Sequence, residues 1–198
     1  LFIQQVAQKK SEYLYAMGAE EPPTSGFQPR PHAAHDFLRS VHRRFRWVVV
    51  DVPRGDPALQ RQLIEASTDI LIVTDLSLPG VRDAMRLQQI VHDAAPQARL
   101  FVATGGAIDA RRSAVKVTDV ERTLKRKVDC KLPTDPTSTL TAVNFGKPLP
   151  EAAPNSPIVK ALRPLVVSLD SSGAGRSALP KSNAASLLSR FRLSGQKK

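Results

Sequence analysis

Short apolar runs that alternate with helix-like segments constrain the fold of this chain more than any other feature. Three mainly apolar runs lie at 47–50, 70–73 and 99–103, and the first of them is β-branched from 48 to 50. Uninterrupted apolar runs of this length are typical of strands buried on both faces of a parallel sheet. The segments between them, at 57–66 and 81–94, have the length and pattern of helices, which parallel connections require. The sequence therefore predicts right-handed βαβ units.

The flanking segments extend the same alternation. An amphipathic helix is expected over 32–45, and the pair Asp56-Pro57 is typical of a helix start. A capping box formed by Thr118 and Glu121 predicts a helix through about residue 126. A short strand around 128–132 and a last helix near 158–167 follow. The predicted fold is α/β, with three layers and a mostly parallel sheet flanked by helices.

Length and charge suggest how the chain is divided. Its 198 residues suffice for one domain with an appended tail. The net charge is +11, and residues 170–198 hold six bases against one acid, or +5. We expect residues 1–31 to continue a truncated α/β domain, 32–169 to form the C-terminal part of that domain, and 170–198 to be a largely disordered basic tail with a short amphipathic helix. Because no initiating Met begins the chain, we expect an N-terminal portion to precede it.

Composition excludes several classes of protein. A single cysteine, Cys130, rules out a disulfide framework and a multi-cysteine zinc site, and we expect it to be an inert buried thiol. No apolar run reaches the roughly 20 residues of a transmembrane helix, and no signal sequence opens the chain. The expected compartment is the cytoplasm.

A candidate magnesium and phosphate site follows the first apolar run. Asp51 would close a buried strand, where a carboxylate can hold Mg²⁺ directly or through water. Gly55 would let the next loop approach a phosphate. The structural alternative is that Asp51 caps a loop and Gly55 turns the chain. No Gly-x-x-x-x-Gly-Lys-Ser/Thr motif occurs in the 198 residues, so the usual phosphate cradle is not encoded here.

Two basic segments suggest anionic partners. Residues 111–131 carry a mixed set of charges with a basic excess, which fits a solvated face or contact with the DNA backbone. In the tail, four apolar residues recur at helical spacing and two arginines flank the last of them. We expect this segment to lie on an anionic membrane, to dock on a partner protein, or to stay disordered. The residues are Ala184, Leu187, Leu188 and Phe191 with Arg190 and Arg192.

Four stretches in a fixed order resemble one protein family. Residues 48–55 look like a Walker B strand and switch II loop, and 69–86 like the strand, loop and helix that follow. Residues 132–136 resemble a Pro-x-Asp loop beside an adenine. Residues 144–149 and 154–157 match a closing N-x-G-K-P-L … P-x-S-P pattern. Together they resemble the C-terminal part of the MinD/ParA deviant P-loop ATPases, most closely the CpaE/TadZ branch of Flp (tad) pilus assembly.

The resemblance implies a set of site residues but no assigned catalytic residue. Asp51, Pro53 and Gly55 would lie near the nucleotide and its magnesium, which Asp51 would contact through water. The adenine side would be formed by Thr104, Pro133 and Asp135. The tail residues Leu187, Leu188, Arg190, Phe191 and Arg192 would correspond to the membrane-targeting helix of MinD.

The resemblance also implies cofactors, partners and an activity. ATP and Mg²⁺ would bind the complete protein as a homodimer that recruits pilus or secretion proteins, peripherally at the inner membrane or cell pole. Because the Walker A motif and the switch I aspartate are absent, hydrolysis is expected to be weak or lacking. Two alternatives remain open: a chromosome or plasmid partition ATPase that binds DNA through a basic surface, and a nucleotide-free scaffold.

Overall fold

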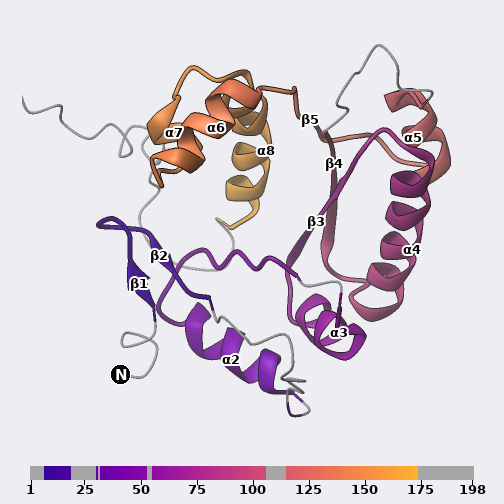
Figure 1. Cartoon of the computed structure of the whole chain (residues 1–198). Helices are drawn as coiled ribbons and strands as arrows, with labels where there is room; N and C mark the ends of the chain where they lie inside the picture. Colours follow the sequence, from indigo (N-terminus) through magenta and orange to yellow (C-terminus); the bar gives the residue numbers. More distant parts are fainter. Residues whose placement is uncertain (1–6, 19–29, 31, 53–54, 106–114, 174–198) are drawn as a thin grey trace, which may run out of the picture. The chain divides into compact units, whose positions relative to one another are not determined.

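The computed structural model describes residues 7–18, 30, 32–52, 55–105 and 115–173 (Figure 1). The chain divides into two compact units, residues 1–67 and residues 68–198. Each unit is considered by itself below.

The first unit combines a small hairpin with two helices. Strands β1 (Gln8–Lys9) and β2 (Tyr15–Ala16) pair in antiparallel fashion, and helices α2 (Ala33–His42) and α3 (Pro57–Glu65) follow. The two helices pack together, and the amide of Ala34 donates a hydrogen bond to Gln62 Oε1 at 3.3 Å.

The start of α3 confirms the prediction made from the Asp56-Pro57 pair. Asp56 is the N-cap, and its carboxylate accepts hydrogen bonds from the amides of Ala58 and Leu59 at 2.9 and 3.0 Å. Pro57 occupies the first turn, where its missing N–H costs nothing because that donor would have no partner inside the helix.

The predicted strand at 47–50 is wrong. These residues have no regular secondary structure, and Val49 is 92% exposed. A buried strand needs neighbours that pair with its backbone amides and layers that cover both of its faces. Among the described residues of this unit, the β1–β2 hairpin is the sole paired structure, and its strands pair with each other. An apolar pattern reports hydrophobicity, but it does not report whether a pairing partner exists.

The second unit holds a parallel sheet with the order β3-β4-β5. Its strands are β3 (Asp69–Thr74), β4 (Arg99–Thr104) and β5 (Cys130–Lys131). Asp69 pairs with Arg99 at the start of the β3–β4 ladder, and Ala103 pairs with Cys130 in the shorter β4–β5 ladder. All three strands lie where the sequence pattern predicts them.

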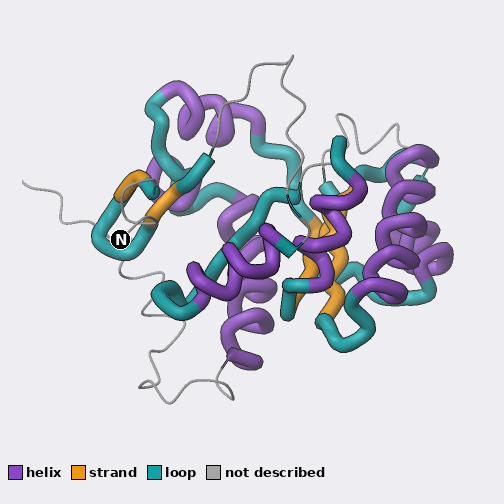
Figure 2. Tube along the Cα trace, turned by 90° about the horizontal axis from the view of Figure 1, so that it is seen from below, coloured by secondary structure: helices purple, strands orange, loops and turns teal. Residues whose placement is uncertain are grey.

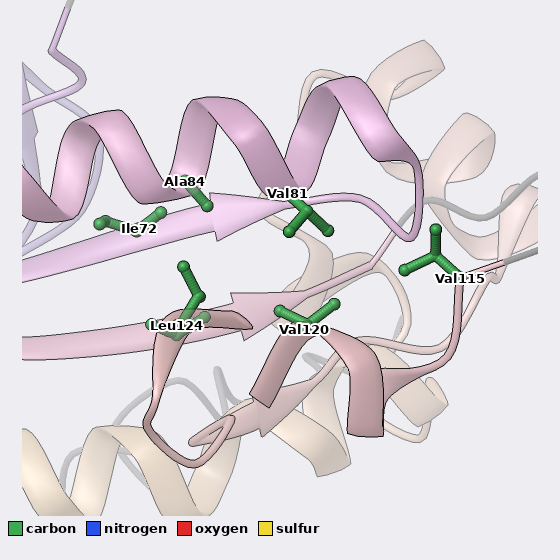
Figure 3. Close-up of a cluster of buried hydrophobic side chains, with 7 residues drawn as sticks. Ile72, Val81, Ala84, Val115, Val120 and Leu124 are labelled. Carbon is green, nitrogen blue, oxygen red and sulfur yellow. The ribbon is translucent and has the colours of Figure 1, made fainter. Parts of the chain in front are cut away.

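Helices flank both faces of this sheet (Figure 1, Figure 2). Helices α4 (Leu78–Ala94) and α5 (Val117–Leu124) cover one face. The cluster on that face includes side chains from both helices and from Ile72 of β3 (Figure 3). On the opposite face α8 (Pro157–Gly173) packs Leu165 against Phe101 and Ala103 of β4. The predicted α/β class with helices on both sides of a parallel sheet is therefore confirmed.

Two helix starts differ from the prediction for local reasons. Helix α4 begins at Leu78 rather than at 81, because Ser77 caps it and its Oγ accepts from the amide of Gly80 at 3.0 Å. The predicted capping box at 118–121 is wrong. Helix α5 begins at Val117, and the carboxylate of Asp119 accepts from the amide of Lys116 at 3.0 Å.

Two further helices lie among the described residues of this unit. Helices α6 (Pro136–Asn144) and α7 (Leu149–Ala152) lie between β5 and α8, and the sequence patterns did not predict them. Helix α6 repeats the start signal of α3, with Asp135 at the N-cap and Pro136 in the first turn. The sequence therefore contained the Asp-Pro start signal for α6. The helix was not predicted because its residues lack the apolar periodicity on which the helix predictions relied.

Candidate functional site

The carboxyl ends of the three strands meet at one edge of the sheet. Thr74 at the end of β3 pairs with Thr104 of β4, and Thr104 pairs with Lys131 of β5. Both threonines are buried. In open α/β sheets, ligands bind in the crevice outside this edge, so the loops that leave it form the candidate site.

Short contacts hold two of these loops against the sheet. The amide of Gly105 donates to the carbonyl of Thr74 at 3.0 Å, and the amide of Leu132 donates to the carbonyl of Thr104 at 2.7 Å. A Cβ at Gly105 would lie 2.8 Å from Cβ of Leu132. The close approach of the loops after β4 and β5 therefore requires glycine at 105.

The loop after β3 is closed by Asp75. Its Oδ1 accepts from the amide of Ser77 at 3.1 Å and from the Ser77 hydroxyl at 2.5 Å. The Ser77 hydroxyl in turn accepts from Gly80 at the start of α4. A Cβ at Gly80 would collide with Asp75 Oδ1, so this compact turn also depends on a glycine.

Asp135 joins two helix starts. Its Oδ1 accepts from the amide of Ser138 at 3.2 Å, which caps α6, and its Oδ2 accepts from the hydroxyl of Ser156 at 2.7 Å. Ser156 is buried, and its Oγ also accepts from the amide of Ile158 at the start of α8. Hydrogen bonds from Ser156 and Ser138 hold the pKa of Asp135 below its ordinary value. Both carboxylate oxygens therefore serve the structure, and the motif serine at 156 is the residue that links α6 to α8.

The structure brings together one group of the predicted site residues. Thr104 ends β4 beside Lys131 and accepts from the amide of Leu132, and Pro133 and Asp135 follow in the loop from β5 to α6. Asp51 and Gly55 belong to the first unit. Asp51 is exposed and follows a segment that forms no strand, so the buried-strand setting from which its role was inferred is missing. Its magnesium role and that of Gly55 stay predictions.

Several predicted residues lie outside the described part of the chain. These are Pro53 and the tail residues Leu187, Leu188, Arg190, Phe191 and Arg192. Among the described residues, no group of three His, Cys, Asp or Glu side chains is placed to hold a metal ion. No helix in that part of the chain has the length and apolarity to cross a membrane.

The structure also shows what sequence reasoning missed at this edge. It did not single out Asp75, and it gave Ser156 no role. The available signal for Asp75 was its place directly after a strand, followed by Ser77 and Gly80 in a helix start. Cys130 is buried, as expected: burial raises the pKa of its thiol, and Sγ donates to the carbonyl of Ala161 at 3.3 Å.

The basic stretch around α5 lines a shallow hollow of about 440 Å³. Four cationic residues line it together with Thr118 and Glu121, and they are Arg122, Lys125, Arg126 and Lys127.

Three of these cations already have acidic or carbonyl partners. Arg122 pairs with Asp119 at 3.2 Å. Lys127 pairs with Glu121 at 3.4 Å. Arg126 donates to the carbonyl of Leu100 at 2.5 Å and so ties the end of α5 to β4. Arg126 also lies 3.7 Å from a carboxylate oxygen of Asp129, so three of the four positive charges in this hollow have an acidic partner.

The chain is an α/β protein: a parallel sheet lies between two layers of helices, and loops leave its carboxyl edge. Solved structures show which proteins share this architecture. A ParA family ATPase from Chlorobium tepidum matches with a TM-score of 0.71 and 18% identity, over 81% of this chain and 66% of that one. MinD from Pyrococcus horikoshii, complexed with Mg-ADP, matches with a TM-score of 0.63 and 13% identity, over 76% and 60%. The MinC:MinD complex of Aquifex aeolicus matches with a TM-score of 0.56 and 18% identity, over 75% and 60%.

These matches show that the chain has the fold of the ParA/MinD ATPases. Neither a protein-family model nor a curated protein matches the sequence. The chain spans 60–66% of the length of the three proteins named above.

Proposed function

We propose that this chain forms the base-side part of an ATP-binding positioning or division protein of the ParA/MinD kind. The observation that carries the proposal is the carboxyl edge of the sheet, in a fold shared with these ATPases. Thr104 ends β4 at this edge, and its carbonyl accepts a hydrogen bond from Leu132, where the 132–135 loop begins. A parallel sheet binds ligands at this edge. Because Asp135 already has two partners, the backbone of the loop, rather than that carboxylate, would face the adenine.

The phosphate end would come from a strand beyond these 198 residues. The carbonyls of Thr68 and Thr74 accept from β4, so the alternate residues Leu71 and Val73 turn their amides to the other edge of β3. No strand among the described residues pairs there, and the side chains of Leu71 and Val73 are 41% and 52% exposed. A strand that carries a phosphate-binding loop would complete the sheet at this edge, with Asp51, Pro53 and Gly55 near the magnesium.

Calorimetric titration with Mg-ATP tests this proposal. The polypeptide extended by its upstream coding region is expected to bind saturably, and Asp51→Asn is expected to weaken binding in Mg²⁺ more than in EDTA. Asp36→Asn, another exposed aspartate of the first unit, is the matched control. No saturable binding by the extended polypeptide would overturn the proposal in favour of a nucleotide-free scaffold.

The finer proposal is a CpaE/TadZ-like role in Flp (tad) pilus assembly or secretion, with weak or no ATP hydrolysis. It is supported by the order of motifs from 48 to 157, which includes the Ser156 that links α6 to α8. The protein would act as a homodimer at the inner membrane or cell pole and recruit pilus proteins. Loss of surface pili on deletion of its gene, restored by the wild-type gene, supports this role. Unchanged piliation contradicts it.

A second candidate is a partition ATPase that binds DNA, and the hollow beside α5 is the observation that favours it. Its four cationic residues would contact phosphates, and affinity would fall steeply as salt rises. Retention of DNA by the chain without residues 174–198, which leaves α8 intact, would support this function if it is lost in Lys125→Glu. Retention that vanishes with the tail alone would contradict it.

A further inference from the structure

Helix α2 has one buried side and one cationic side. Ala34 and Val41 are buried, and the amide of Ala34 is hydrogen-bonded to Gln62 of α3, so this side packs within the first unit. Arg39 and the C-cap residue Arg43 lie one turn apart on the opposite side of the helix, and both are exposed. The apolar side of α2 is therefore occupied, whereas its cationic side faces solvent.

The cationic side continues into the segment that follows the helix. Arg44 and Arg46 are exposed, and no Asp or Glu occurs within 37–50. In the part of the chain that the structure describes, Arg39, Arg43 and Arg44 form no ion pair. Three of the four cations beside α5, in contrast, have acidic partners. The positive charge at the end of α2 is therefore available to an anionic partner.

Exposed apolar side chains lie beside these arginines. The ring of Phe45 packs against that of Tyr15 in β2, with centroids 5.3 Å apart and a tilt of 59°. Tyr15 and Trp47 are 38% and 39% exposed, and Leu14 and Met17, which flank β2, are 37% and 46% exposed. The contact between Tyr15 and Phe45 therefore joins exposed apolar side chains of the hairpin to the arginine-rich segment.

The mixture of side chains selects the class of partner. A nucleic acid offers phosphates to arginines and bases to aromatic rings, but aliphatic side chains such as Leu14 and Met17 do not stack on bases. An anionic membrane suits all three kinds. Arginines contact the lipid phosphates, Tyr and Trp lie at the level of the headgroups, and aliphatic side chains enter the boundary with the acyl chains. The composition therefore favours an anionic lipid surface over a nucleic acid.

We propose that the first unit docks on an anionic membrane surface through Arg39, Arg43 and Arg44, with Tyr15 and Trp47 at the level of the headgroups. The contact is peripheral, because the apolar side of α2 packs on α3 and is not free to enter the bilayer. It requires neither the tail nor a bound nucleotide, so it goes beyond the ATP-binding function proposed above.

The fluorescence of Trp47 tests the contact directly, because Trp47 is the only tryptophan of the chain. The full chain is titrated with vesicles of phosphatidylcholine that contain about 30% phosphatidylserine, and with vesicles of phosphatidylcholine alone. We expect a blue shift of the Trp47 emission, and quenching by brominated lipid, with the anionic vesicles only. Cosedimentation with anionic vesicles and an unchanged Trp47 emission would place the contact elsewhere in the chain and overturn the proposal.

Paired substitutions separate these arginines from net charge. Arg43→Gln with Arg44→Gln removes two cations from the surface, and Arg82→Gln with Arg86→Gln, at exposed positions of α4, is the matched control. Each arginine near an anionic membrane raises the affinity about fivefold, so the first variant is expected to bind anionic vesicles about 25-fold more weakly than the wild type. The control variant is expected to bind as the wild type does.

Three results would contradict the proposal. Equal affinities of the two double variants would show that net charge alone is responsible. A lower melting temperature of the Arg43–Arg44 variant with unchanged vesicle affinity would show that these arginines only stabilise the end of α2. Loss of DNA retention by that variant, with vesicle binding intact, would identify a nucleic acid as the partner.

Discussion

At the scale of single residues, the loops at the strand edge depend on polar side chains that make more than one hydrogen bond. Asp135, Ser156 and Asp75 each accept or donate more than one hydrogen bond within their loops. Such residues define loop geometry because their side chains bond neighbouring backbone groups, and for the buried Ser156 a lost partner would also be costly. Their positions fix the backbone that a ligand at the strand edge would meet.

Ser156→Ala is expected to lower stability, and more so at neutral pH than in acid. The variant loses the cap of α8, worth about 1 kcal/mol, at any pH. It also loses the hydrogen bond that lowers the pKa of Asp135. A lowered native pKa stabilises the fold above the ordinary aspartate pKa of about 3.9, and this contribution disappears as the pH falls through the native value.

Urea unfolding of the wild type and of Ser156→Ala at pH 7 and near pH 3 measures this difference. The difference in the free energy of unfolding between the wild type and Ser156→Ala should become smaller in acid. Ser171→Ala, an exposed serine of the same helix, is the control and should change little at either pH. The same difference in the free energy of unfolding at both pH values would show that the pKa of Asp135 does not depend on Ser156.

Gly80→Ala is expected to destabilise the second unit although alanine is the better helix former. Helix propensity favours alanine by about 1 kcal/mol. The new Cβ would collide with Asp75 Oδ1, and moving that carboxylate breaks its hydrogen bonds to Ser77. The collision should outweigh the propensity and leave a net loss of about 1–2 kcal/mol.

A double-mutant cycle with Asp75→Ala checks the cause, using thermal melting. In the Asp75→Ala background, Gly80→Ala should be neutral or stabilising because the colliding atom is gone. Gly55→Ala, where an added Cβ meets nothing within 4 Å, is the control. Equal destabilisation in both backgrounds would contradict the explanation.

At the scale of elements, strands of similar composition have different surroundings. Residues 101–104 of β4 are buried on both faces, as its apolar run predicts. Strand β3 is covered by α4 on the side of Ile72, whereas Leu71 and Val73 on the other side are exposed. Helix α8 packs on β4 and β5, so its position decides which half of the sheet is covered.

The uncovered half of β3 is expected to make the isolated chain associate. An edge strand with exposed apolar side chains is a template for pairing with another chain. Val73→Lys should therefore lower concentration-dependent association measured by light scattering. Val143→Lys adds the same charge on helix α6 and should have a smaller effect, and an equal effect would show that net charge alone is responsible.

At the scale of the whole molecule, two units and an uneven charge distribution organise the chain. The formal charge of +11 suggested a nucleic-acid surface, but +5 of it lies in residues 170–198. In the body, cations beside α5 are paired with Asp119 and Glu121. The backbone hydrogen bond from Val128 also holds the pKa of Glu121 below its ordinary value and keeps it charged.

The 198-residue chain alone is expected to show no saturable binding of Mg-ATP. Its sequence lacks the Gly-x-x-x-x-Gly-Lys-Ser/Thr loop whose amides and lysine hold phosphates. Calorimetry at neutral pH measures this directly, with unfolded chain as the blank. Tight, magnesium-dependent binding would reveal a phosphate site of a different kind.

The sequence by itself determined the α/β class, the position of every strand in the parallel sheet, and the Asp56-Pro57 helix start. These features depend on neighbours in the sequence: apolar runs, helical spacing, and a side chain that reaches an amide two or three residues away. Only the tertiary structure decided that residues 47–50 form no strand, because a strand requires a second strand to pair with, and no local sequence pattern contains that partner. It also decided the role of Asp135, whose second oxygen bonds Ser156, 21 residues further along the chain. Contacts of that range depend on how helices and strands pack, so Asp135 could be named from the sequence, whereas its partner Ser156 could not.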